Sequence, residues 1–333
     1  MAVSELGGLA EIEGWTDEGQ KSFLPRMWWG LWSFSKKKPL GAACGLIIFF
    51  FFVIGDVIPE TANKIASVAG VGGTPVPYVA DILADNTGFL YSYDKQDLRA
   101  RLQGSSGKHL LGTDAIGRDI LSRLVYGART AVMVSFGAVL ISQVIGAGIG
   151  ISSGFYGGAY DKVLYRFVDV SQSLPGLVVL ITILGIFDSG LWQLVIVLGV
   201  YGGPINSRVV RGQTIYIMAS PFIEAARVVG ASDRRIMMRY LLPNVFALII
   251  LSSTVQLGFI VLLEATLSFL GYGLPPPFPS WGQMLSLEGR NYMRTQPGLA
   301  IYPGLAIGLL VFSYNLFGDA LRDVLDPRLR GSR

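Results

Sequence analysis

The feature that most constrains this chain is a series of long stretches without a single Asp, Glu, Lys or Arg. These stretches cover residues 40–55 (extending through Asp56 to residue 58), 130–160, 170–187, 189–207, 240–263 and 295–318. A helix needs roughly 20 mostly apolar residues to cross the hydrocarbon core of a bilayer, which is about 30 Å thick. The pattern therefore predicts an all-α polytopic membrane protein with six transmembrane helices.

The composition excludes several other classes of protein. Only 15% of the 333 residues are charged and 51% are hydrophobic, whereas soluble domains are about 25% charged. The chain has one cysteine, Cys44, and one histidine, His109, so a disulfide scaffold or a zinc module is excluded and no metal site is expected. A net charge of +4 gives no reason to expect a nucleic-acid partner, and the expected surroundings are membrane lipid.

Positive residues in the short loops set the expected orientation, because they stay on the cytoplasmic side. They cluster before the first span, between spans four and five, and in the tail: Arg26, Lys36, Lys37, Lys38; Arg208, Arg211, Arg227, Arg234, Arg235, Arg239; Arg322, Arg328, Arg330, Arg333. With six spans, all three clusters lie on one side, so both termini are predicted to be cytoplasmic.

This orientation gives a division of the chain into segments. We expect a cytoplasmic tail at 1–39, a first transmembrane helix at 40–58, an extracytoplasmic region at 59–127, a five-helix core at 128–318 with a loop at 221–243, and a cytoplasmic tail at 319–333. Trp28, Trp29 and Trp32 predict an interfacial segment in the first tail, with an ordinary hydrophobic helix as the alternative. Residues 265–287 are also free of charge, but four prolines among them break any helix, so a re-entrant segment packed on the protein is expected.

The 221–243 segment has the signals of two short helices joined by a sharp turn. Pro221 suits the first turn of a helix, and Gly230 suits a left-handed residue that ends it. Ser232 is a good N-cap for the second helix, and Asp233 favours the positive end of its dipole. Such a compact unit fits a groove on a partner protein, although a membrane-surface elbow explains the same pattern equally well.

The spacing within this segment resembles the EAA motif of bacterial ABC importer permeases. The matching residues are Glu224, Ala225, Ala226, Gly230, Leu241, Leu242 and Pro243, and Ala231, Ser232 and Arg234 lie between them. Tyr240 departs from the pattern, which usually has an aliphatic residue at that position. In that family the loop forms the coupling helix, which sits in a cleft of the ATPase subunit, so the resemblance implies an ATPase-coupling role for these residues and a type I importer permease fold.

Two further stretches and the tail narrow the resemblance to dipeptide and oligopeptide permeases of the DppC/OppC type. The pattern before the second span includes Gly112, Thr113, Asp114, Gly117, Arg118, Asp119, Ser122, Arg123 and Arg129. The stretch 264–271 with 279–282, and the tail 315–328, resemble the same permeases. The resemblance covers about residues 98–330, and it says nothing about the long 59–95 segment.

The residues themselves suggest structural roles for the charges in these stretches. Alternating charges between Asp114 and Arg129 are expected to form a salt-bridge lattice that fixes the start of the second span, with substrate contact as the alternative. Glu264 ends a charge-free run. An ionisable group in a membrane span is costly and has to face protein. We therefore favour a buried structural role for this glutamate over a role in proton coupling. Asp169 is expected as a second buried polar residue, paired with Arg166 one turn earlier.

The chain has no nucleotide-binding motif of its own, because Gly104–His109 lacks the Walker A spacing. The resemblance therefore implies a transport subunit without enzymatic activity and without a cofactor, with ATP and Mg held by two ATP-binding subunits. It also implies a homologous second permease, an extracytoplasmic substrate-binding protein, a peptide substrate and a bacterial inner (plasma) membrane location. Nickel chelates, glutathione and oligosaccharides remain alternative substrates. A secondary transporter and a membrane-embedded enzyme are the competing classes.

Overall fold

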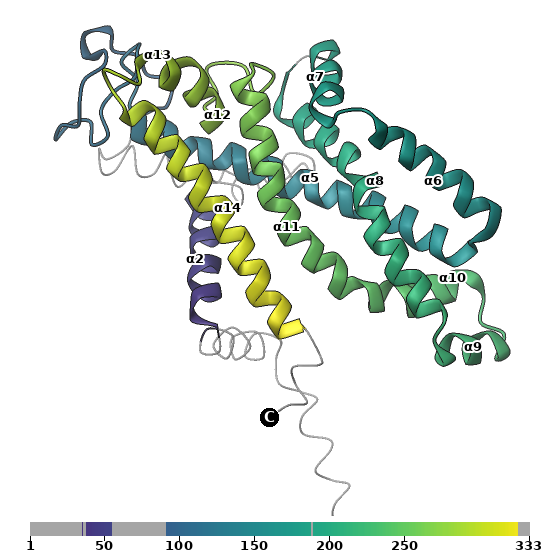
Figure 1. Ribbon diagram of the computed structural model, residues 1–333. Coiled ribbons are helices and arrows are strands. Elements are labelled where there is room, and N and C mark those ends of the chain that lie inside the picture. Colours follow the sequence, from purple (N-terminus) through teal and green to yellow (C-terminus); the bar gives the residue numbers. More distant parts are fainter. Residues whose placement is uncertain (1–34, 36–37, 55–90, 188, 326–333) are drawn as a thin grey trace, which may run out of the picture.

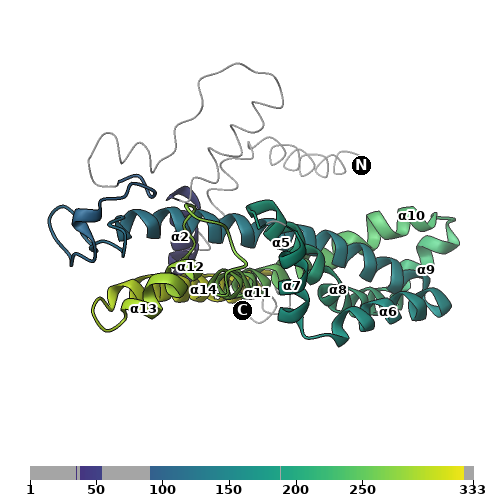
Figure 2. The ribbon, with the colours of Figure 1, turned by 90° about the horizontal axis from the view of Figure 1, so that it is seen from above.

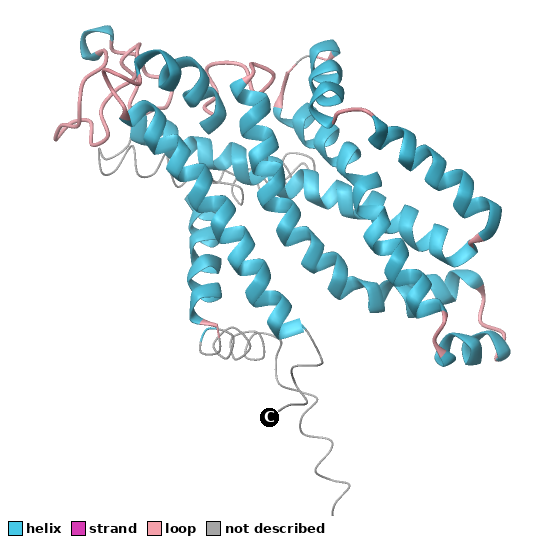
Figure 3. Ribbon diagram, viewed as in Figure 1, coloured by secondary structure: helices cyan, strands magenta, loops and turns pink. Residues whose placement is uncertain are grey.

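Helices make up all the regular structure in the part of the chain that the computed structural model describes, which is residues 35, 38–54, 91–187 and 189–325 (Figures 1 and 3). Their order is α2 (Pro39–Ile54), η4 (Leu98–Ala100), α5 (Ile120–Tyr156), α6 (Gly158–Ser173), α7 (Gly176–Ile186), α8 (Leu191–Met218), α9 (Pro221–Val228), α10 (Asp233–Arg235), η5 (Ile236–Leu241), α11 (Leu242–Phe269), α12 (Trp281–Met284), η6 (Leu285–Gly289), α13 (Arg290–Tyr292) and α14 (Gly298–Leu325). The expectations for the tryptophan-rich tail, most of the 59–95 segment and the last eight residues lie outside the described residues.

Helices follow the charge-free stretches, as expected for an all-α membrane protein. Within the described residues, three helices are long and apolar enough to cross a membrane: Ile120–Tyr156, Asp233–Phe269 and Gly298–Val324. The bent pair α6 and α7 makes a fourth if it forms one span, and α2 is a shorter apolar helix. Helix α8 has 28 residues and extends beyond its expected stretch to include Arg208 and Arg211.

The third expected span, 170–187, is not one helix. Helix α6 begins earlier, at Gly158, and ends at Ser173, and α7 leaves it at an angle of 84°. Leu174, between them, has extended backbone with ψ of 144°. Pro175 follows it, and a proline both lacks an N–H and disfavours helical backbone in the preceding residue. The break therefore lies at a signal that the sequence contains.

Glycines on α5 let α8 pack directly against its backbone. A Cβ atom at Gly150 would lie 2.7 Å from the carbonyl oxygen of Ser207, and one at Gly154 would lie 2.8 Å from the Thr214 side chain. Gly146 meets α8 in the same way, at Asn206. Small residues at four-residue spacing allow such close contact between membrane helices, where apolar burial alone does not hold helices together.

The 265–287 segment packs on the protein, as a re-entrant element has to. Trp281 is 1% exposed, and its Nε1 donates a hydrogen bond to the carbonyl oxygen of Leu124 at 2.9 Å. The hydroxyl of Thr130 donates to the carbonyl oxygen of Pro279 at 3.0 Å. These hydrogen bonds join the segment to the first turns of α5. They leave fewer polar backbone groups without a hydrogen-bond partner.

The assembled helices form an elongated body. In Figure 2, α13 lies at one end of the molecule, and α6, α9 and α10 lie at the other. Helix α2 lies beside α14 in Figure 1, and Lys38 forms an ion pair with Asp323 near the end of α14. The α9–α10 unit protrudes at the far corner from the loops before α5 (Figure 1).

Candidate functional site

The 221–243 segment folds as a short helix, a left-handed turn and a second helix. Pro221 begins α9, and Gly230 has φ of +84°. The amide of Ala231 donates to the carbonyl oxygen of Ala226 at 3.0 Å, and that of Gly230 donates to Arg227 at 2.9 Å. This pair of hydrogen bonds is a Schellman motif, which satisfies the last carbonyls of a helix. Ser232 is the N-cap of α10, although its side chain makes no capping hydrogen bond.

A separate apolar core holds this unit against the rest of the protein. Ile223 of α9 and Ile236 of η5 are both fully buried. They belong to a cluster with Leu241 of η5 and with residues of α5, α8 and α11: Ile151, Val210, Ile217, Val245 and Ile249. The Arg227 guanidinium also lies over the Phe155 ring at 5.9 Å. Because the core joins α9 to three long helices, a force on α9 is transmitted to them.

The opposite face of the unit is open and apolar at its tip. Val228 and Val229 are each 88% exposed, and Glu224, Arg234 and Arg235 around them are exposed too. Exposed apolar groups with a charged rim are typical of protein-binding surfaces. We call the residues Val228 and Val229, with the exposed side chains of Glu224, Arg227, Arg234 and Arg235, the tip surface.

The second helix of the unit continues into a membrane span. Helix α10 passes into the π-helical segment η5 and then into α11 without a break in the chain, so that residues 233–269 form one apolar helix. Leu242 and Pro243 lie where the π-helical segment passes into α11, and a proline inside a continuous helix removes one backbone hydrogen bond. The tip surface is therefore connected to α11 by continuous helical backbone.

A buried ion cluster lies before α5 and joins it to η6. Arg118 Nε lies 2.5 Å from Oδ2 of Asp114, and its Nη2 lies 2.7 Å from Oε1 of Glu288, 170 residues away. Arg123 Nε is 3.8 Å from the same Asp114 oxygen. Asp114 and Arg123 are at most 1% exposed. Breaking such a buried pair leaves an uncompensated charge, so the cluster fixes the two segments in one arrangement.

Asp119 joins the start of α5 to the preceding loop. Its Oδ2 accepts hydrogen bonds from the amide and hydroxyl of Ser122, both at 2.8 Å. Its Oδ1 lies 2.9 Å from Nδ1 of His109. An aspartate N-cap with a second bond satisfies a free amide of the first turn and stabilises the helix by about 1 kcal/mol. Gly112, Thr113 and Gly117 shape the loop, and both glycines have positive φ.

Glu288 has an unusual protonation behaviour within the ion cluster. Burial, together with the neighbouring charge of Asp114, raises the pKa of Glu288 above its ordinary value, although Arg123 and Arg118 act in the opposite direction. A carboxyl group with a raised pKa carries a proton in the folded state at a pH where an exposed glutamate is ionised.

The two acidic residues expected in buried positions have different surroundings. Glu264 is 2% exposed and accepts a hydrogen bond from the Ser268 hydroxyl at 2.7 Å. Asp169, in contrast, has a side chain that is 56% exposed, and its partner is Arg208 of α8 at 2.8 Å rather than Arg166. The burial and the pairing expected for Asp169 are therefore wrong, because helix-to-helix packing brings an arginine from α8 closer than the one on its own helix.

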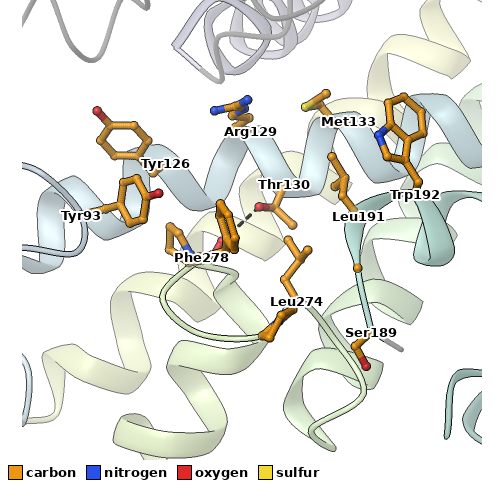
Figure 4. A pocket seen from close by; sticks show the side chains of 13 residues that line it. Tyr93, Tyr126, Arg129, Thr130, Met133, Ser189, Leu191, Trp192, Leu274 and Phe278 are labelled. Carbon is orange, nitrogen blue, oxygen red and sulfur yellow. Dashed lines mark hydrogen bonds between the residues drawn. The ribbon is translucent and has the colours of Figure 1, made fainter. Parts of the chain in front are cut away.

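Arg129 lines an aromatic cavity of about 390 Å³ between α5, the start of α8 and the loop after α11 (Figure 4). Tyr93 and Tyr126 lie with ring centres 4.8 Å apart on one side. Phe278 and Trp192 contribute to the other walls.

Comparison with known proteins places this geometry in a family. The family described as "Binding-protein-dependent transport system inner membrane component" matches residues 146–331. This range contains α6 to α14, the two-helix unit and the re-entrant segment. The chain belongs to this family. It is thus a permease subunit of an ABC importer, with multiple helices in the membrane, and not a secondary transporter.

Individual relatives are permeases of peptide-type importers. The chain is 38% identical to a glutathione transport system permease protein GsiD of Pectobacterium atrosepticum over 245 residues, which is 73% of this chain and 81% of the relative. It is also 38% identical to the dipeptide transport system permease protein DppC of Alkalihalophilus pseudofirmus over 239 residues, 72% of this chain and 78% of the relative. The resemblance to the dipeptide and oligopeptide permeases is confirmed.

A solved structure supports the fold of this permease. An inward-facing form of the MetNI methionine ABC transporter superposes with a TM-score of 0.51 and 21% identity, covering 61% of this chain and 97% of the matched chain. This similarity confirms the expected type I importer permease fold.

One group of polar residues in the permease was missed by the analysis of charges. Ser142, Gln143, Asn206, Ser252 and Gln256 come together from three long helices. All of them lie in stretches that were recognised only by the absence of charge. Counting uncharged amides within those stretches would have drawn attention to Gln143, Asn206 and Gln256.

Proposed function

We propose that this chain is the permease subunit of an importer for di- or oligopeptides, and that it forms half of the translocation path. A homologous second permease supplies the other half, two ATP-binding subunits hold ATP and Mg, and an extracytoplasmic substrate-binding protein delivers the peptide. Both termini and the 221–243 segment are on the cytoplasmic side of a bacterial inner membrane. The chain itself holds no cofactor and performs no hydrolysis.

The observation that carries this proposal is the rigid, exposed tip surface on a unit continuous with α11. Val228 and Val229 offer apolar area that the described part of the chain leaves uncovered, and the surrounding arginines suit a partner surface that carries acidic side chains. The Schellman turn and the Ile223–Ile236 core keep the unit stiff. When ATP closes the two ATPase subunits, the unit moves with them, and α11 with its neighbours tilts to open the path outward.

The names of the relatives support a peptide-type substrate. Glutathione and dipeptides are both small peptides with free carboxylates. We expect the importer to carry a substrate of this class, and nothing about the described residues favours a nickel chelate or an oligosaccharide.

The proposal is tested by purifying the permease with the proteins encoded beside it. We expect an ATPase subunit to copurify with the unaltered chain and to be lost from a Val228→Asp, Val229→Asp double variant, since two buried charges at a small apolar contact cost several kcal/mol. Membrane insertion of the variant should be unchanged, because neither valine contacts the folded core.

Asp323→Ala is the matched control. Asp323 lies at the end of α14 and is exposed like the valines, but its partner is Lys38 rather than the 221–243 segment. This variant should keep its ATPase subunit. An ATPase that stays bound to the double variant, or one that never copurifies with the unaltered chain, contradicts the proposal.

A further inference from the structure

A cluster of uncharged polar side chains joins three helices near their middles. Asn206 Nδ2 of α8 donates to Oγ of Ser142 on α5 at 2.7 Å and to Oε1 of Gln256 on α11 at 2.6 Å. Gln256 Nε2 also donates to Ser142 at 2.8 Å. Gln143 Nε2 donates to Gln256 at 3.1 Å and to Oγ of Ser252 at 3.2 Å. Polar groups at this depth of a membrane protein are costly, and they often mark a substrate path.

A cavity of about 430 Å³ opens beside this cluster, between α8 and α11. Its volume is typical of sites for small molecules. Asn206, Ser252 and Gln256 are its polar lining, and the remaining wall is apolar or aromatic: Leu198, Tyr201, Gly202, Ile205, Val255, Phe259, Ile260 and Leu263. None of these lining residues is charged. The cavity therefore offers hydrogen bonds without selecting for the charge of a ligand.

The cluster leaves one acceptor and one donor without a partner on two residues that line the cavity. Within the described residues, Asn206 uses its Nδ2 for two bonds but its Oδ1 for none. Gln256 Nε2 has two hydrogens and donates one bond, to Ser142. Both amides are held in place by the other members of the cluster, so little side-chain entropy is lost when a ligand binds.

Close packing of α8 on α5 is what brings the amides together. A Cβ atom at Gly202 would lie 2.8 Å from both Nε2 of Gln256 and Oγ of Ser142. Any larger residue at position 202 would push into the cluster. The glycine thus lets the polar groups of three helices meet at the edge of the cavity.

We propose that Asn206 and Gln256 bind the main chain of the peptide as it passes this cavity, an inference that rests on the proposed function. The free acceptor on Asn206 and the free donor on Gln256 together complement the N–H and C=O of a peptide bond. Main-chain binding in an uncharged cavity is independent of the substrate's side chains, and the aromatic and aliphatic walls accommodate apolar ones. The two residues would set a preference for peptide bonds rather than for a particular sequence.

A purely structural role has to be distinguished from this one, because asparagine and glutamine also join membrane helices without contacting any ligand. Gln143 provides the comparison. It is 6% exposed and does not line the cavity, and among the described residues its hydrogen bonds go to other members of the cluster. If the cluster only joins helices, replacing Gln143 and replacing Gln256 should change uptake alike. If Gln256 binds the substrate, the two replacements should have different effects on uptake.

The test uses the complete importer, reconstituted in liposomes with its binding protein. Uptake is measured for labelled dialanine and for the analogue whose peptide nitrogen is methylated, which lacks the main-chain donor. We expect Gln256→Leu and Asn206→Leu each to raise the apparent KM for dialanine about two- to tenfold, the size of one neutral hydrogen bond. We expect Asn206→Leu, but not Gln256→Leu, to reduce the preference for dialanine over the analogue by a similar factor, because the analogue lacks the N–H that Asn206 would bind and keeps the carbonyl oxygen that Gln256 would bind. The binding protein contributes equally in every variant, so its own preference cancels in this comparison.

The outcomes separate this inference from the proposed function. If the unaltered importer takes up neither dipeptide, the proposed function fails. If it takes up dialanine, but the preference is unchanged in Asn206→Leu, or falls equally in Gln143→Leu, or the KM is unchanged in Gln256→Leu, main-chain binding by these residues is wrong. Retained preference in Gln143→Leu, with reduced preference in Asn206→Leu and a raised KM for both dipeptides in Gln256→Leu, supports it.

A second measurement covers the case in which the leucine variants do not assemble. Cys44 is the chain's single cysteine, so Cys44→Ala with Ser252→Cys leaves one thiol at the cavity wall. The complex is trapped with a non-hydrolysable ATP analogue. Peptide held in the path should then slow the reaction of this thiol with a small maleimide several-fold. Equal reaction rates with and without peptide would overturn the inference.

Discussion

At the scale of single residues, Gly230 decides the shape of the 221–243 segment. Its φ of +84° is left-handed, and a Cβ atom there would meet nothing within 4 Å. The cost of replacing it is therefore conformational rather than steric. We expect Gly230→Val to disfavour the observed turn by about 1–2 kcal/mol, which lowers transport and transport-coupled ATPase activity while membrane insertion persists. Uptake assays and quantification of the membrane-inserted protein measure the two effects.

Gly230→Asn is the matched control for this residue. Asparagine adopts left-handed backbone more readily than other non-glycine residues, so it should retain more uptake than valine does. Normal uptake by Gly230→Val would show that the turn is not needed for coupling.

Predictions for single residues were correct where the local backbone determines the conformation. They were wrong where packing between helices determines the partner of a residue. The left-handed Gly230 and the helix start at Pro221 follow from the conformational preferences of those residues. The partner of Asp169 does not, because Arg208 reaches it from another helix. The polar cluster around Gln256 was missed for the same reason, since its members are far apart in sequence and carry no charge.

At the scale of helices, the contact between α5 and α8 depends on glycine. A side chain at Gly150 would collide with the Ser207 carbonyl oxygen and with Val210, both 2.7 Å from the position of its Cβ. We expect Gly150→Leu to separate the two helices and to destabilise the protein by about 1–3 kcal/mol, the usual cost of overpacking. A lower melting temperature of the purified protein in detergent would be the readout.

Gly148 on the same helix is the control, because it is exposed and a Cβ atom there meets nothing within 4 Å. Gly148→Leu should melt close to the unaltered protein. Similar melting temperatures for the two leucine variants would mean that α8 does not depend on this close approach.

The helices themselves could largely be predicted, because a run without charge of sufficient length has few alternatives to a helix in a membrane. Their ends could not. Helix α8 continues past the expected end because Arg211 and Arg208 find partners in Asp161 and Asp169 on α6. The break between α6 and α7 depends on Pro175, a signal that a search for charge alone ignores.

At the scale of the whole molecule, the charges divide between the two ends of the helices. Helix α14 begins beside the loops before α5, where Nε2 of Gln296 donates to the Gln103 carbonyl oxygen at 2.6 Å. It ends beside Lys38, the residue before α2. The basic 221–243 segment lies at this second end as well (Figure 1). Because positive residues remain in the cytoplasm, we expect the second end to face inward.

Single-cysteine variants in a Cys44→Ala background test this orientation. Ser105, Arg235 and Arg322 are exposed, and Ser105 lies in the loops before α5. A membrane-impermeant maleimide should label Ser105→Cys in intact spheroplasts, and it should label Arg235→Cys and Arg322→Cys only after permeabilisation. The reverse pattern would place the tip surface outside the cell, where no ATP-driven subunit could reach it, and the coupling role of the 221–243 segment would then be untenable.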